Sequence, residues 1–186
     1  MMNENDKPTF NKDLYNWLWN YSLNYLARFE VSQNKLEFKL KERREKYPTD
    51  VAVSEYNTVL NAVIAKLLEQ NLLSDTRYGQ SRIRQLYARG KATSFIKQDL
   101  RRNGLDEFLI EDLLSQEADE EYSPDELTAL RYIKKRKFGC YRIVNADYKQ
   151  KQKELAALAR QGFGYDLANR MLALEYDEAE EIIRRL

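Results

Sequence analysis

The chain has 186 residues, with 31 Lys and Arg against 30 Asp and Glu, no histidine and one cysteine. Without histidine there is no imidazole base, no Ser-His or Cys-His nucleophile pair and no histidine-ligated metal. The lone Cys140 forms neither an internal disulfide nor a cysteine-rich zinc site. We therefore expect a protein that is not an enzyme and that uses no metal or cofactor.

Hydropathy and composition favour an all-α protein of the cytoplasm. The polar, acidic N-terminus lacks the layout of a secretory signal, and no apolar stretch approaches the roughly 18 residues that span a bilayer. Only six glycines and three prolines interrupt long runs of residues that favour helices.

Apolar residues recur at helical spacing along the chain, after a polar segment, residues 1–13, that we expect to form a flexible arm. The first apolar stripe runs from Trp17 to Phe29, and the clearest runs from Val59 to Leu68. Shorter stripes at 96–100 and 109–113 continue the pattern. About nine short helices are expected.

Capping residues predict where several helices begin and end. Ser123, Pro124 and Glu126 have the spacing of a capping box with proline at the first helical position. Gly104 and Gly162 suit the left-handed residue that often ends a helix. The segment 90–93 resembles the tail of a phosphate loop but lacks its first glycine and its Ser or Thr, so we interpret it as a turn between helices.

The sequence also repeats itself with a period of about 58 residues. Residues 100–105 align with 158–163 at this shift, and a looser copy lies at 43–47. Units of this size bury little surface alone. We therefore expect three units that stack as a short helical array.

Charge is segregated along the chain although the net charge is only +1. Residues 77–102 carry eight bases and one acid, residues 106–126 carry ten acids and no base, and residues 131–153 carry nine bases and one acid. Such blocks suit a basic face that binds a partner. They suit equally a basic block that the acidic block neutralises within the molecule.

Aromatic residues interleave with the basic blocks, and exposed rings there would be able to stack on unpaired bases. At helical spacing, however, we expect about two in three of them to belong to the core. The six residues are Tyr78, Tyr87, Phe95, Tyr132, Phe138 and Tyr141.

Four segments together resemble the RecX family of bacterial regulatory proteins. They are residues 25–40, 63–78, 96–105 and 155–163, and their order and spacing matter more than any one motif. The resemblance covers about residues 20 to 175. It implies three tandem three-helix repeats in an elongated, curved array, with repeat 1 at 14–74, repeat 2 at 75–122, repeat 3 at 123–175 and a C-terminal helix at 176–186.

The resemblance also implies a function. RecX proteins bind the RecA recombinase filament on single-stranded DNA, lie in its groove and restrain its ATPase, strand exchange and coprotease activities. We accordingly expect a monomeric modulator whose own direct binding to DNA is weak. The basic side chains expected to contact the filament are Arg77, Arg82, Arg84, Arg89, Lys91, Lys97, Arg101, Arg102, Lys134, Lys135, Arg136, Lys137 and Arg142.

Two other functions remain open from the residues alone. Three-helix units with a basic helix also resemble helix-turn-helix modules, which would make the chain a stand-alone DNA-binding protein. An adaptor that docks through the acidic block at 106–126 is the third interpretation.

Overall fold

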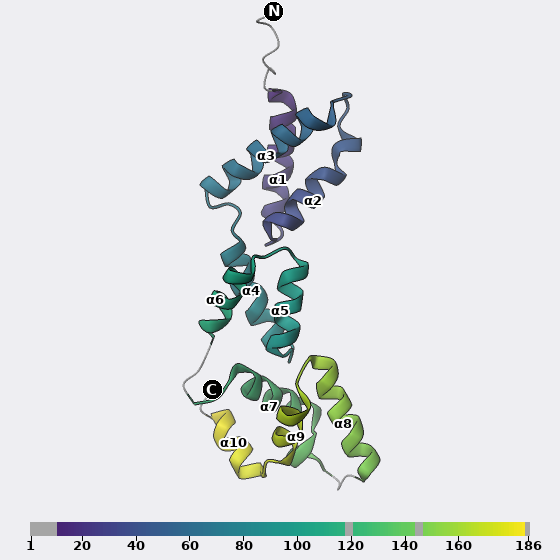
Figure 1. Cartoon of the computed structure of the whole chain (residues 1–186), viewed down its shortest axis with the longest axis vertical. Coiled ribbons are helices and arrows are strands. Elements are labelled where there is room, and N and C mark those ends of the chain that lie inside the picture. The colour runs from purple at the N-terminus through teal and green to yellow at the C-terminus, as the bar shows by residue number, and fades with distance from the viewer. Residues whose placement is uncertain (1–10, 118–120, 144–146, 185–186) are drawn as a thin grey trace, which may run out of the picture. The chain divides into compact units, whose positions relative to one another are not determined.

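The computed structural model describes residues 11–117, 121–143 and 147–184. These residues form α-helices and two short 3-10 helices and contain no strand, which confirms the all-α prediction (Figure 1). The α-helices are α1 (Lys12–Leu26), α2 (Gln33–Glu42), α3 (Val53–Glu69), α4 (Asp75–Ala88), α5 (Thr93–Arg102), α6 (Glu107–Ser115), α7 (Pro124–Arg136), α8 (Tyr148–Gln161), α9 (Tyr165–Ala173) and α10 (Tyr176–Arg184). The 3-10 helices are η1 (Arg44–Lys46) and η2 (Gly139–Tyr141).

The chain divides into two compact units. Unit 1 comprises Met1–Tyr78 with Asn103–Leu105, and unit 2 comprises Gly79–Arg102 with Asp106–Leu186. In sequence order the helices make three successive triplets followed by α10.

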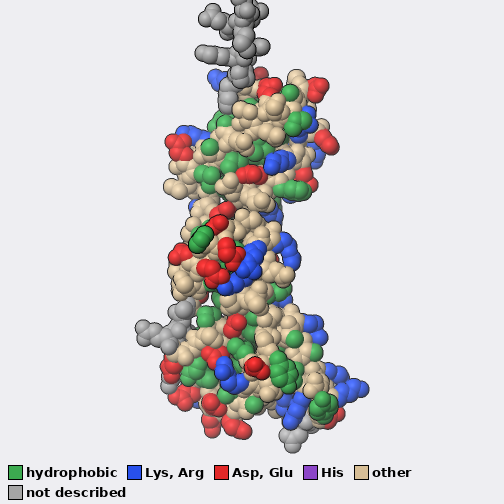
Figure 2. All heavy atoms as spheres, in the orientation of Figure 1, with side chains coloured by type: hydrophobic (Ala, Val, Ile, Leu, Met, Phe, Trp, Pro, Cys, Tyr) green, Lys and Arg blue, Asp and Glu red, His purple; other side chains and the backbone are tan. Residues whose placement is uncertain are grey.

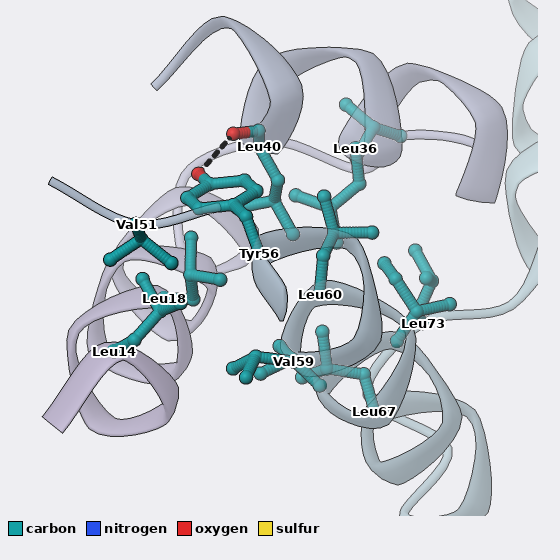
Figure 3. Packing of buried hydrophobic residues seen from close by; sticks show 13 residues of the cluster. Leu14, Leu18, Leu36, Leu40, Val51, Tyr56, Val59, Leu60, Leu67 and Leu73 are labelled. Carbon is teal, nitrogen blue, oxygen red and sulfur yellow. Dashed lines mark hydrogen bonds between the residues drawn. The ribbon is translucent and has the colours of Figure 1, made fainter. Parts of the chain in front are cut away.

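The core of unit 1 is formed mainly by α1, α2 and α3 (Figure 3). The predicted stripe on α3 is buried from Val59 to Leu67, whereas Leu68 is exposed because it lies at the edge of that face. The Tyr56 ring lies inside this core, and its hydroxyl donates a 2.6 Å hydrogen bond to the Leu40 carbonyl. Burial raises the pKa of Tyr56 to about 12, so the phenol stays protonated and keeps this bond.

Unit 2 has its main core around α7, α8, α9 and α10, with Leu130, Ile133 and Leu158 fully buried. The predicted capping box is present at the start of α7: Ser123 accepts from the Glu126 N–H, and the Glu126 side chain accepts from the Ser123 N–H. The predicted C-terminal helix is α10, although residues 185–186 lie outside the described residues.

The same polar joint occurs twice, once in each unit. In unit 1 the Ser32 hydroxyl donates to the Asn103 carbonyl (2.6 Å), and the Gln33 N–H donates to Asp75 (2.7 Å).

In unit 2 the Ser94 hydroxyl donates to the Gly162 carbonyl (2.7 Å), and the Thr93 N–H donates to Asp125 (2.7 Å). In both joints a serine and a backbone N–H at the start of one helix contact a glycine turn and an aspartate in the first turn of a later helix. A similar polar joint therefore holds a helix start in each unit.

Glycine is required at the turns beside these contacts. Gly104 and Gly162 both have positive φ, at 83° and 98°, as predicted for residues that end helices. A Cβ at position 162 would lie only 3.0 Å from the Ser94 oxygen. The 90–93 segment is the expected turn, between α4 and α5, with φ of 76° at Gly90.

Two boundaries differ from the predictions. Helix α1 begins at Lys12, within the expected 1–13 arm, because the Asn11 side chain accepts from the Leu14 N–H and caps the helix; residues 1–10 lie outside the described residues. The apolar stripe was expected to continue in a helix as far as Phe29, but α1 ends at Leu26.

Candidate nucleic-acid interface

The predicted basic residues fall into two groups: those held in ion pairs within the protein and those without an ion-pair partner in the part of the chain the structure describes. The paired residues are Arg77, Arg82, Lys97, Arg101, Lys134 and Arg142. The residues with no such partner are Arg84, Arg89, Lys91, Arg102, Lys135, Arg136 and Lys137. The charges of the second group are not offset by an ion pair among the described residues.

Arg82 is a structural residue. Its guanidinium binds Asp99 with two hydrogen bonds, Nε to Oδ2 at 2.7 Å and Nη2 to Oδ1 at 2.9 Å, and both residues are half-buried. This bidentate pair ties α4 to α5.

Two bases of α5, Lys97 and Arg101, form ion pairs with acids of α6. Arg101 makes two hydrogen bonds with Glu107, at 2.7 and 2.5 Å, and Lys97 pairs with Glu111 at 2.5 Å. Figure 2 shows blue and red side chains side by side over this part of unit 2. For these residues the second interpretation of the charge blocks is correct: the acidic block neutralises part of the basic block internally.

Arg142 forms an ion pair with a buried carboxylate. Its guanidinium makes two 2.7 Å hydrogen bonds with Glu154, whose side chain is 1% exposed and also accepts from the Gly139 N–H. Lys134 pairs with Glu180 of α10 at 2.7 Å, and in unit 1 Arg77 pairs with Glu30 at 2.9 Å.

A basic groove lies in unit 2 between the end of α4 and α7. It has a volume of about 230 Å³, and none of its lining residues is acidic. We define the basic groove by its four cations, which have no ion-pair partner among the described residues, and by the two tyrosines beside them: Arg89, Arg131, Lys135, Arg136, Tyr87 and Tyr132.

The packing of the α4–α5 turn on α7 sets the shape of the basic groove. A Cβ at position 90 would lie 2.8 Å from the Tyr132 ring, so only glycine lets the turn approach this closely. The Tyr87 hydroxyl bonds the Thr93 hydroxyl at 2.8 Å, and Thr93 in turn bonds Asp125. These contacts hold the two sides of the basic groove together, and the four cations that line it are exposed.

A second hollow lies at the C-terminal end of α7, where bases line it together with Asp147 and the buried Glu154. Its volume is about 530 Å³, and Arg136 lines both hollows. Lys137, Lys149 and Lys153 add three exposed bases, and Figure 2 shows blue side chains gathered over this end of α8.

The structure brings together three of the predicted residues, Arg89, Lys135 and Arg136, and adds one that the prediction omitted, Arg131. Arg131 and Lys135 are four residues apart and so share one face of α7, a spacing that was visible in the sequence. Lys149 and Lys153 have the same spacing on α8 and were also missed. Arg84 and Arg102 are exposed but line neither hollow.

The aromatic residues of the basic blocks are mostly part of the packing, as predicted. Tyr78 is buried, and the other five are half-buried. The Tyr141 hydroxyl donates to Glu180, and the Lys91 ammonium lies 4.3 Å from the Phe95 ring centre.

Among the described residues no cluster of acids and cysteine has the arrangement of a metal site, and no helix has the length and apolar character to cross a membrane. Burial raises the pKa of the Cys140 thiol, which disfavours the reactive thiolate.

Comparison with known proteins identifies the family. The family models described as the second and third three-helix domains of RecX match residues 74–114 and 124–172. Regulatory protein RecX of Agrobacterium fabrum is 26% identical over 171 residues, which cover 91% of this chain and 89% of that protein. Regulatory protein RecX of Myxococcus xanthus is 30% identical over 161 residues, 84% of each chain.

Solved structures agree on the fold. A crystal structure of RecX from Lactobacillus salivarius matches with a TM-score of 0.63 over 94% of this chain and 99% of that one, at 21% identity. The repeated three-helix domains, the helix order and the sequence similarity along most of the chain point to one conclusion. This chain belongs to the RecX family of regulatory proteins.

Proposed function

We propose that this RecX-family chain binds the RecA filament on single-stranded DNA and inhibits its ATPase, strand-exchange and coprotease activities. In this way it modulates DNA recombination and repair. The chain acts as a monomer in the cytoplasm, and its direct affinity for DNA is weak beside its affinity for the filament.

The observation that carries the proposal is the basic groove. Four exposed cations that have no ion-pair partner among the described residues line it: Arg89, Arg131, Lys135 and Arg136. In the filament groove they would meet DNA phosphates and acidic protein surface. A chain held there by many modest contacts bridges neighbouring RecA protomers and blocks their movement or further growth.

The paired bases take a different role in this proposal. Arg82, Arg101 and Arg142 each pair with a carboxylate of the same unit. Removing Arg82 or Arg142 would disturb the fold before it disturbed binding, because their partners are shielded from solvent, whereas the Arg101–Glu107 pair is half exposed and contributes little to stability. The expected contact set is therefore narrower than the sequence suggested.

The test is a triple variant, Arg89→Ala, Arg131→Ala and Lys135→Ala, titrated onto RecA filaments at several salt concentrations. Each lost phosphate contact lowers the slope of log affinity against log salt by about 0.7 on single strands. We expect weaker binding, a slope reduced by about 2 and loss of inhibition of DNA-dependent ATP hydrolysis.

The matched control removes three exposed lysines from unit 1, Lys12, Lys41 and Lys46, with the same change in net charge. Equal affinity and slope for the triple variant and the wild type would refute the basic groove as the contact. A wild-type chain that prefers naked duplex with a sequence preference, and leaves ATP hydrolysis unchanged, would favour the stand-alone DNA-binding function instead.

A further inference from the structure

The second hollow of unit 2 is one to which the proposed function assigns no ligand. It has a volume of about 530 Å³ and is formed by the end of α7, the segment after it and the first two turns of α8. This volume lies within the range of small-molecule sites in proteins. We call it the α8 hollow and define it by six of its lining residues: Arg136, Lys137, Phe138, Ile143, Lys149 and Lys153.

Four of these six residues are bases, and they come from two helices. Arg136 is the last residue of α7 and Lys137 follows it, whereas Lys149 and Lys153 are four residues apart and so share a face of α8. All four are exposed, and none has an ion-pair partner among the described residues.

The two acids of the lining already have other partners. The Asp147 carboxylate caps α8 by accepting from the Gln150 N–H at 2.7 Å, and Glu154 is buried in its ion pair with Arg142. The whole lining contains five bases against these two acids. The α8 hollow therefore carries an excess of positive charge, which suits an anionic ligand.

The backbone at Lys137 is unusual for a lysine. Its φ of 55° and ψ of 49° lie in the left-handed region, which glycine adopts without strain and which most other residues avoid. Glycine is the common residue where a helix ends in this conformation. Capping of α7 therefore does not explain the choice of lysine, whereas a charged side chain in the lining of a binding site does.

The α8 hollow also has an apolar side. Phe138 is half-buried and packs edge-on against Tyr132, with ring centres 6.2 Å apart and planes 72° apart. Ile143 is 84% exposed. Figure 2 shows hydrophobic side chains among the basic ones at the start of α8. Apolar surface beside a few charged groups is the usual lining of a site for a small organic ligand.

We propose that the α8 hollow binds a free nucleoside polyphosphate, with the phosphates on Lys137, Lys149 and Lys153 and the base against Ile143. A polyphosphate concentrates several negative charges at one end of a small molecule, which matches four bases around one hollow. A nucleic-acid strand instead spreads its phosphates along a chain. This ligand is bound without proton transfer, so the lack of histidine does not oppose it. The site stands or falls independently of filament binding.

The test measures binding of ATP to the full chain by titration calorimetry, with no RecA present. Inorganic tripolyphosphate and a tetranucleotide of dT are the comparison ligands. Wild type is expected to bind ATP more tightly than tripolyphosphate, because only ATP has a base to contact the apolar side. It is also expected to bind ATP more tightly than the tetranucleotide, whose phosphates are spread out.

A pair of double variants tests the phosphate contact. Lys149→Ala with Lys153→Ala should weaken binding of both ATP and tripolyphosphate about ten-fold. The matched control, Lys151→Ala with Arg160→Ala, removes the same charge from exposed positions of the same helix outside the α8 hollow and should have little effect. Thermal unfolding of each variant shows whether the fold is intact.

A single variant tests the apolar contact. Ile143→Ala should weaken ATP binding about three-fold or more and leave tripolyphosphate binding unchanged, because only the base loses buried apolar area. Val53→Ala is the control, since it shortens a 53% exposed apolar side chain of unit 1.

Three results would overturn the proposal. Equal losses for the two double variants would show that only the overall charge of α8 matters. ATP binding no tighter than that of tripolyphosphate would leave no contact for a base. A tetranucleotide that binds the wild type as tightly as ATP would assign the α8 hollow to a nucleic-acid strand instead.

Discussion

Glu154 is the charged side chain that is fully buried among the described residues. Burial by itself raises the pKa of this carboxyl, but hydrogen bonds from Arg142, the Gly139 N–H and Gln150 outweigh it, and the pKa lies below its usual value of 4.5. The carboxylate thus joins α8 to the turn after α7. A buried ion pair of this kind does not by itself make a fold more stable than an apolar contact would. Removing one partner, however, leaves the other charge buried without a counter-charge, which is destabilising.

Replacing Glu154 with Gln should destabilise the protein by about 2 kcal/mol at neutral pH, because Arg142 loses its charged partner. The folded-state pKa of Glu154 is lowered, so its contribution is present above pH 4.5 and is lost as the pH falls through the folded pKa. Urea unfolding across pH should therefore show wild type and variant converging at acid pH.

Glu107→Gln is the control, because that carboxylate is half exposed and its ion pair with Arg101 contributes little to the free energy of unfolding. A difference between Glu154→Gln and wild type that stays constant from neutral to acid pH would contradict the assignment of a buried, ionised carboxylate.

At the scale of elements, the repeated joint explains how short helices that bury little surface alone are held together. Helices α2 and α5 each begin at a polar contact with a later helix, through Asp75 in unit 1 and Asp125 in unit 2. Burial raises the pKa of Asp75, opposed by the hydrogen bond from the Gln33 N–H. These aspartates satisfy backbone donors that the helix starts leave unpaired.

Asp125→Ala should lower the free energy of unfolding by about 1–3 kcal/mol, since it leaves the half-buried Thr93 N–H without an acceptor. Asp75→Ala should have a similar effect at Gln33. Chemical denaturation followed by circular dichroism measures both.

Asp166→Ala is the matched control, because Asp166 is an exposed aspartate in the first turn of α9. If it destabilises the protein as much as Asp125→Ala, then the interaction with the helix dipole, and not the joint, accounts for the effect.

At the scale of the whole chain, the net charge of +1 arises because the basic and acidic blocks of the sequence cancel each other. Some of these opposite charges also meet in ion pairs. Lys97 and Arg101 of α5 are neutralised by Glu111 and Glu107 of α6. The bases that line the basic groove have no acid beside them in that lining. Opposite charges on adjacent helices thus concentrate the field of unit 2 around the groove.

Exchanging the charges of one α5–α6 pair, Arg101→Glu with Glu107→Arg, should leave filament affinity and its salt slope at the wild-type values. The pair is neutral in either orientation and lies outside the basic groove. Titration beside the groove triple variant checks this expectation. A loss of affinity as large as that of the triple variant would place the contact surface on α5 and α6 instead.

The sequence by itself determined the helical fold, the helix caps and the family. Ser123, Gly104 and Gly162 were identifiable because capping depends on residues a few positions apart. The stripe on α3 was equally visible, since the helix period alone decides which residues share a face. The exact ends of α1 were not, because Asn11 and the loop after Leu26 decide them through particular hydrogen bonds.

Only the tertiary structure decided which charges are available. Arg82 and Arg89 look alike in the sequence, yet one binds Asp99 seventeen residues away and the other lines the basic groove. Likewise Arg131 lies beside Arg89 in the basic groove only because α7 packs against the α4–α5 turn. Ion pairs and grooves join residues distant in the chain, so local patterns that fix helices cannot specify them.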